Sequence, residues 1–468
     1  MKEKTHKSNV SIDNIYELNG RVPLGKAIPF GLQHVLAMFV ANLVPILIVM
    51  SAAFVDGGTR NFTSAEIAGI LQCGMFAAGI GTAIQLYPIW KVGSKLPIVM
   101  GCSFTFLAAM MGIATNPLYG YEGLIGAIMV GGVIEGTLGL TAKYWRKYLG
   151  DIVPACVVMA IGLSLLSVGI NSFGGGDGSA DFGAWYHLVI AAITLVSCLV
   201  FKNVVKGVWR NLDVLFGLAV GYVLSVIFTV TGIAPVVNFA AFGETIDQLG
   251  FFNVPLPVFL KGTMPTFNVG PIVSMTIVFL VSAAETIGDT TALCQGGLGR
   301  DIEEKEISGS LAIDGFGSFM SSFFSTPPVT SFSQNVGLVA MTKVVNRFTI
   351  MTGAVIMVLC GLLPPIANFF ASMPDCVLGG CTVMMFGNIC VAGFEMLSRA
   401  GFNHRNNTIV SLALAIGVGT TAASEADIWH IFPQMIQDVF AANVVAVIFV
   451  VAIVLDLILP KNMDVKAE

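Results

Sequence analysis

Long apolar runs separated by short polar breaks dominate the chain from Ile28 to its C-terminal end. Many of these runs are about 20 residues long, which is the length of helix that crosses the hydrocarbon core of a bilayer. The pattern predicts an all-α polytopic membrane protein with fourteen transmembrane spans. We expect the spans to begin near residues 28, 65, 96, 122, 150, 186, 211, 270, 307, 333, 348, 376, 405 and 436.

Composition agrees with a lipid environment. Hydrophobic residues make up 55% of the chain and charged residues 11%, with a mean hydropathy of +0.84, whereas soluble domains carry about 25% charged residues. The first 27 residues are polar and have no apolar core of the kind that precedes signal cleavage, so we expect no cleaved signal peptide. A net charge of -5, nine cysteines mostly within apolar runs and five scattered histidines indicate neither nucleic-acid binding nor a metal or other cofactor.

Lysine and arginine positions predict the orientation. With fourteen spans and both termini in the cytoplasm, all of the 23 Lys and Arg residues except Arg60 and Lys261 fall on the cytoplasmic side. We therefore expect a multi-pass protein of the plasma or inner membrane. Residues 238–269 form an extracytoplasmic linker between two halves of seven spans, which is the layout of a seven-plus-seven inverted repeat.

Two of the predicted spans, the third and the tenth, are interrupted. The third contains "PIVMGCSFTF" (residues 97–106), and the tenth contains "TPPVTSFSQNVG" (residues 326–337). Proline cannot continue a helix, and irregular backbone at membrane depth is tolerated where it lines a cavity or is buried in protein. A half-helix beginning near Ser333 or Gln334 would point its free N–H groups into the middle of the membrane. We expect a binding site for a polar ligand there; the alternative is a proline kink that only packs.

Carboxylates within apolar runs mark candidate functional positions, because a charge in hydrocarbon is costly. Glu285 and Asp289 are four residues apart and share one helix face, and Asp314 lies among small residues in the next span. We expect these three to bind substrate or carry protons. His34 in the first span either binds substrate or fixes a neighbouring helix by a hydrogen bond, and Glu135 is expected to be a local hydrogen-bond partner.

The stretch "QNVGLVAMTK" (residues 334–343) resembles the signature of the nucleobase-ascorbate transporter family, and Gln334, Asn335, Gly337, Thr342 and Lys343 match it. "GLQHVLAMF" and "AAETIGD" are similar to other landmarks of that family. The resemblance implies homodimers and two domains in each chain. The core domain would comprise residues 28–148 and 270–373, the gate domain residues 149–237 and 374–460, and the cytoplasmic tails residues 1–27 and 461–468.

The resemblance also implies roles for individual residues. Glu285 looks like the acidic residue that hydrogen-bonds the nucleobase, and Gln334 resembles its partner in recognition. Asn335 would shape the site, Asp314 is similar to an essential carboxylate, and His34 occupies the place of a histidine that supports affinity and folding.

The assignment of the chain to one branch of the family depends on fewer residues. Uracil permeases typically carry His in place of Asp289 and Glu in place of Gln334. Ascorbate carriers typically have Pro in place of Gln334. Asp289 together with Gln334 therefore resembles the xanthine and uric acid branch. Strict xanthine carriers tend to have Asn in place of Ser103, whereas members that accept uric acid tend to have Ser or Thr.

These observations predict a secondary active transporter, not an enzyme, that imports xanthine, uric acid or both by proton symport through alternating access. Sodium coupling, a uracil permease of the same family and an inorganic-anion transporter of the same fold are the alternatives. An intramembrane aspartyl protease using Asp289 and Asp314 is disfavoured, because the "GxGD" motif is absent before Asp289.

Overall fold

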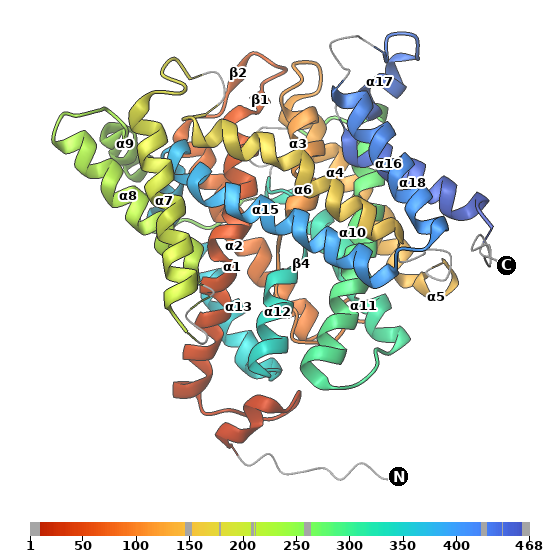
Figure 1. Ribbon diagram of the computed structural model, residues 1–468. Coiled ribbons are helices and arrows are strands. Elements are labelled where there is room, and N and C mark those ends of the chain that lie inside the picture. The colour runs from red at the N-terminus through yellow and green to blue at the C-terminus, as the bar shows by residue number, and fades with distance from the viewer. Residues whose placement is uncertain are drawn as a thin grey trace.

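The computed structural model describes residues 10–145, 152–176, 179–206, 210, 212–256, 264–422, 428–441 and 443–460, and it is mostly helical (Figure 1). The predicted tail at residues 461–468, the first nine residues of the other tail and the boundary predicted between residues 148 and 149 lie outside the described residues. Residues 257–263 of the predicted linker lie outside them as well.

Short elements interrupt a succession of long helices. The first half contains η1 (Ile12–Tyr16), α1 (Leu24–Ala52), β1 (Phe54–Val55), β2 (Arg60–Asn61), α2 (Ser64–Leu86), β3 (Met100–Cys102), η2 (Phe104–Phe106), α3 (Leu107–Ala114), α4 (Gly120–Leu140), α5 (Ala142–Trp145), α6 (Ile152–Phe173), α7 (Trp185–Val204), α8 (Asp213–Val230) and α9 (Phe239–Leu249). The second half contains α10 (Val269–Leu293), η6 (Cys294–Leu298), α11 (Glu304–Phe323), β4 (Val329–Ser331), α12 (Ser333–Thr342), α13 (Arg347–Cys360), α14 (Pro364–Ala371), α15 (Asp375–Ala400), α16 (His404–Ala422), α17 (Gln434–Phe440) and α18 (Val444–Ile458).

Within the described residues, eight helices are long and apolar enough to cross a membrane by themselves. A ninth candidate consists of α13 and α14, which meet at an angle of 78°. These helices support a helical membrane protein, and the count of fourteen spans with an inverted repeat stays a prediction. Part of the predicted linker, Phe239–Leu249, forms the helix α9. The stretch "AAFGETIDQL" contains several good helix formers, which accounts for this helix.

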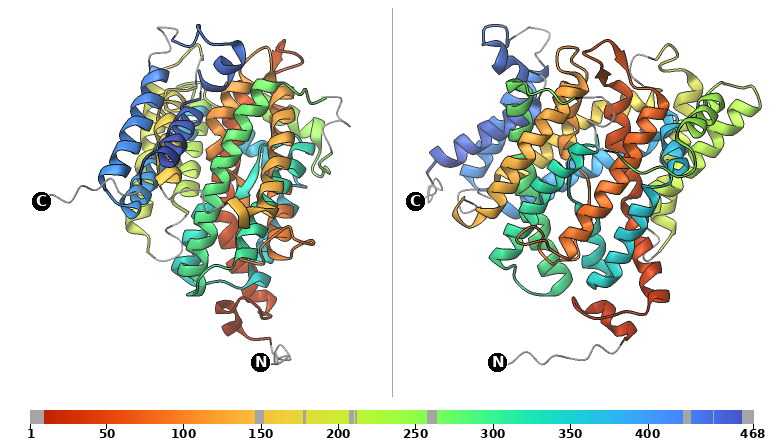
Figure 2. Two further views of the ribbon diagram at one scale, coloured as in Figure 1. Left: turned by 90° about the vertical axis from the view of Figure 1, so that its right-hand side faces the viewer. Right: turned by 180° about the vertical axis from the view of Figure 1, so that it is seen from behind.

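The long helices form two groups, which Figure 2 shows side by side in its left view. In the first helix group, α4 packs along α11 and α10, and α13 packs against α1 and α2. In the second helix group, α6 packs along α15, α7 along α8, and α16 along α18. The hairpin of β1 and β2 lies at the end of the molecule opposite the N-terminal segment (Figure 1).

Both segments that we predicted to be broken contain a short strand followed by a helix. The two strands, β3 and β4, pair antiparallel near the centre of the molecule, with Met100 opposite Ser331 and Cys102 opposite Val329 (Figure 1). All six strand residues are buried. The pairing therefore brings together two segments that are more than 200 residues apart in the sequence, and because it is antiparallel, the helices that follow the two strands leave from opposite ends of the pair.

Polar side chains from neighbouring helices bind the backbone of this strand pair. Asn42 Oδ1 on α1 accepts the Cys102 N–H at 2.6 Å, Thr82 Oγ1 on α2 accepts the Met100 N–H at 2.9 Å, and Ser318 Oγ on α11 accepts the Val329 N–H at 3.1 Å. Backbone groups left unpaired at membrane depth cost several kcal/mol each. These three side chains therefore allow irregular backbone in the interior of the first helix group.

Candidate functional site

Two short helices begin directly after the strand pair and face α10. Ser103 follows β3, and its hydroxyl accepts the Thr105 N–H at 3.1 Å, which caps the start of η2. On the other strand, Phe332 follows β4 and α12 begins at Ser333, as the proline-rich break in the sequence predicted. The first residues of both helices thus lie next to the carboxylates of α10.

Glu285 and Asp289, one helical turn apart on α10, accept hydrogen bonds from three hydroxyl groups. Thr105 Oγ1 donates to Glu285 Oε2 at 2.6 Å, and Ser331 Oγ lies 3.2 Å from Asp289 Oδ2. Ser333 Oγ lies 2.8 Å from Asp289 Oδ2 and 3.2 Å from Glu285 Oε1, so it bridges the two acids. Both carboxylates are partly accessible.

Asp314 on α11 joins the same network through Thr286. Thr286 Oγ1 donates to Asp314 Oδ2 and lies 2.9 Å from Ser331 Oγ, which in turn contacts Asp289. Asp314 itself is fully buried. Hydroxyl groups therefore connect all three carboxylates that the sequence identified. In the described part of the chain, no three Asp, Glu, His or Cys side chains are arranged to hold a metal ion.

Glu135 differs from its expected role as a local hydrogen-bond partner. It is fully buried on α4, and neither of its carboxylate oxygens has a hydrogen-bond partner among the described residues. The expectation was wrong because α4 and α11 meet there through glycines, and glycines offer no side-chain donor. Gly136 directly follows Glu135, and a Cβ on Gly315 would overlap the backbone nitrogen of Gly136.

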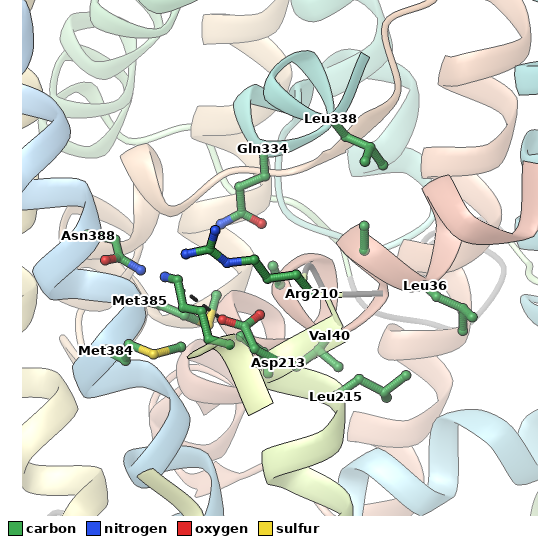
Figure 3. Close-up of a pocket in the computed structure, with 14 residues that line it drawn as sticks. Leu36, Val40, Arg210, Asp213, Leu215, Gln334, Leu338, Met384, Met385 and Asn388 are labelled. Carbon is green, nitrogen blue, oxygen red and sulfur yellow. Dashed lines mark ion pairs between the residues drawn. The ribbon is translucent and has the colours of Figure 1, made fainter. Parts of the chain in front are cut away.

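Gln334 is exposed and lines a pocket of about 220 Å³ between the two helix groups (Figure 3). It forms no hydrogen bond with the described residues, so its amide donor and acceptor are both available. Residues of α1 and α12 line the pocket from one side, and residues of α7, α8 and α15 line it from the other. Gln334 directly follows Ser333, so the start of α12 links the pocket to the carboxylate network.

Asn335 and His34 are buried behind this surface and do not line the pocket. Asn335 Nδ2 donates to the backbone oxygen of His34 at 3.1 Å, and this bond ties the start of α12 to α1. Neither ring nitrogen of His34 has a partner among the described residues. Gln334 thus lines the pocket, Glu285 and Asp289 are partly accessible beside Ser333, and Asn335 and His34 are buried.

Sequence reasoning missed the hydroxyl groups of Thr105, Ser331 and Ser333. Ser and Thr are common in apolar helices, where they usually bond to their own backbone, so their identity alone carries little information. The available signal was their position within the two interrupted segments.

A family model described as a permease family matches residues 25–426. The chain belongs to the nucleobase-ascorbate transporter family. It is 32% identical over 421 residues to the uric acid permease PucJ of Bacillus subtilis, covering 88% of each chain. It is also 30% identical over 422 residues to the uric acid transporter UacT of Escherichia coli (90% of this chain and 83% of the relative). A xanthine permease of Bacillus subtilis is 30% identical over 435 residues (93% and 94%).

Solved structures of other transporters share the fold of this nucleobase-ascorbate transporter family member. The transmembrane domain of the cyanobacterial bicarbonate transporter BicA aligns with a TM-score of 0.54 at 14% identity, covering 91% of this chain and 97% of that domain. The murine anion transporter Slc26a9 in its inward-facing state aligns with a TM-score of 0.57 at 12% identity (97% and 73%). Members of the family are permeases, so the protein is a transporter and not an enzyme, and the protease alternative is set aside.

Proposed function

We propose that this transporter imports an oxidised purine, uric acid or xanthine, across the cell membrane. The observation that carries the proposal is the position of Gln334, free at the pocket, immediately after the hydroxyl of Ser333 that bridges Glu285 and Asp289. The relatives named for uric acid and xanthine support this choice of substrate.

The side chains of Glu285 and Gln334 and the start of α12 suit such a ligand. Oxidised purines present N–H and C=O groups alternately around the ring, and a glutamine amide offers an acceptor and a donor side by side. A carboxylate only accepts, so Glu285 is matched to a ring N–H. The first N–H groups and positive end of α12 would favour a carbonyl oxygen of the substrate. Asn335 and His34 would hold α12 in place.

We further propose that the carboxylate network couples purine uptake to protons. Glu285, Asp289 and Asp314 are linked by hydroxyls that can both donate and accept. Three acids at this depth, to which none of the described lysine or arginine residues is bonded, are costly as anions, so a proton is a natural co-substrate and sodium is less favoured.

The coupling is tested with purified protein in liposomes. An inwardly directed proton gradient should drive accumulation of labelled uric acid or xanthine without sodium, and a protonophore should abolish the accumulation. Accumulation that requires sodium and survives the protonophore would contradict proton symport.

The proposed transport cycle uses the two helix groups as moving parts. Core segments 28–148 and 270–373 would move against gate segments 149–237 and 374–460 and expose the cleft to each side in turn. The proposal includes fourteen spans in a seven-plus-seven inverted repeat, residues 238–269 as an extracytoplasmic linker, cytoplasmic termini and a homodimer. Its basis is the lysine and arginine distribution and the family resemblance.

Ser103 is proposed to set the preference between the two purines. Replacing Ser103 with asparagine should lower uric acid uptake relative to xanthine by about tenfold, because a larger side chain beside Thr105 leaves less room for the additional oxygen of uric acid. Asparagine caps helices as well as serine does, so η2 should remain intact. The measurement is the ratio of initial uptake rates, with Ser103→Thr as the control that keeps the hydroxyl. An unchanged ratio in Ser103→Asn would remove Ser103 from substrate selection.

A further inference from the structure

The pocket beside Gln334 has polar walls contributed by the second helix group. These walls contain Lys202 at the end of α7, Arg210, Asp213 at the start of α8 and Asn388 on α15. Apolar side chains, including Val40, Leu338 and Met385, cover the remaining surface (Figure 3). In Figure 1 the C-terminal end of α7 lies toward the same end of the molecule as the red N-terminal segment, which is the end we propose to be cytoplasmic.

The charges in this pocket do not balance. Lys202 Nζ lies 3.9 Å from Asp213 Oδ2, and Asp213 is largely buried. Arg210 is close enough to interact electrostatically with the same carboxylate, yet it forms no ion pair or hydrogen bond with any residue that the structure describes. Two cations therefore share one anion, and one positive charge is left facing the pocket.

The orientation of Arg210 suggests what could balance that charge. In Figure 3 its guanidinium points toward the amide of Gln334, and Asn388 lies on the opposite wall. A guanidinium offers a planar pair of N–H donors that suits two adjacent acceptor atoms carrying negative charge. The two amides add further donors and acceptors, and methionine sulfur packs well against aromatic rings.

We propose that this pocket is a second purine station on the cytoplasmic side of the Glu285 network, and that it holds the anionic form of the purine through Arg210. The inference rests on the proposed function. Uric acid is a weak acid that is mostly a monoanion at neutral pH, whereas xanthine is mostly neutral, so the station favours uric acid. The acids around Glu285 disfavour an anion and Arg210 attracts one, so a purine that releases its proton to water on the cytoplasmic side binds at Arg210 as an anion before release.

The test compares the two faces of the transporter. Initial rates of labelled uric acid and xanthine transport are measured in inside-out and right-side-out membrane vesicles containing wild type, Arg210→Gln, Arg210→Lys or Lys206→Gln. Lys206 is the matched control, because it is exposed in the same connection and does not line the pocket. Arg210→Lys keeps the charge without the planar donor pair.

We expect Arg210→Gln to raise the KM for uric acid at the cytoplasmic face by about tenfold, as loss of a hydrogen bond to a charged group does. The KM for xanthine at that face should change by less than about threefold, and Arg210→Lys should fall between wild type and Arg210→Gln. Lys206→Gln should match wild type. A KM that stays normal at the extracytoplasmic face shows that the variant is folded.

Three outcomes would overturn the station: an unchanged cytoplasmic KM in Arg210→Gln, equal changes for the two purines, or the same effect in Lys206→Gln. A wild-type protein that transports neither purine would instead overturn the proposed function. The two failures are therefore distinguishable in the same experiment.

Discussion

Replacing Glu285 with glutamine is expected to lower uptake of labelled uric acid and xanthine by about a hundredfold or more. Glutamine has nearly the same shape, so packing around α10 should survive, but the substitution removes a charged acceptor. Glu285 accepts from Thr105 at 2.6 Å and from Ser333 at 3.2 Å, and it is the proposed partner of a purine N–H. Hydrogen bonds to charged groups contribute about 1.5–3 kcal/mol each, and 1.4 kcal/mol is a factor of ten in affinity.

The measurement is initial uptake in cells, normalised to the amount of protein in the membrane. Glu304→Gln is the matched control, because Glu304 is an exposed glutamate at the start of α11 that does not line the pocket. It should transport like wild type. If Glu285→Gln keeps more than about a third of wild-type uptake, Glu285 does not bind the substrate and the proposed site needs another acceptor.

Replacing Gly315 with alanine is expected to destabilise the protein by about 1–3 kcal/mol and to reduce transport as well. Gly315 lies where α11 crosses α4, and its Cβ would overlap the backbone nitrogen of Gly136 and lie 2.5 Å from the backbone oxygen of Gly132. Backbone atoms cannot rotate away as side chains can, so the two helices must separate. Asp314 is the adjacent residue, and its bond from Thr286 would be disturbed.

Gly317→Ala provides the control on the same helix. A Cβ on Gly317 would meet its nearest atoms at 3.6 and 3.7 Å, which are ordinary contacts. Alanine also favours a helix over glycine by about 1 kcal/mol. Thermal unfolding of detergent-purified protein should therefore show a lower midpoint for Gly315→Ala alone. Equal midpoints for the two variants would mean that α4 and α11 lie farther apart at Gly315 than in this structure.

The sequence was most informative about features that depend on local chemistry. Apolar runs predicted where the long helices lie, and the prolines predicted a helix start near Ser333 or Gln334, where α12 begins at Ser333. Spacing alone put Glu285 and Asp289 on one face of α10, and the structure shows them sharing the Ser333 hydroxyl. The signature motif identified the family, and the family model agrees with it.

Features that depend on contacts between distant segments could not be predicted in this way. Nothing local in "MGC" or "VTS" specifies a two-stranded pair, because three residues carry no periodic pattern and their partners lie on the other half of the chain. The roles of Asn42 and Thr82 depend on those strands, because both side chains accept N–H groups of β3. In the sequence, Arg210 was one of the cations that predicted the cytoplasmic side. Its position in the pocket beside Gln334 depends on the packing of the two helix groups.

The most direct test of the central claim is uptake of labelled uric acid and labelled xanthine by cells expressing the wild-type protein, in competition with unlabelled xanthine, uracil or sulfate. We expect saturable uptake of at least one of the two purines, inhibited by xanthine and unaffected by uracil or sulfate. If neither purine enters while the protein is present in the membrane, or if uracil or sulfate competes as well as xanthine does, the assignment of Glu285 and Gln334 to an oxidised purine is contradicted.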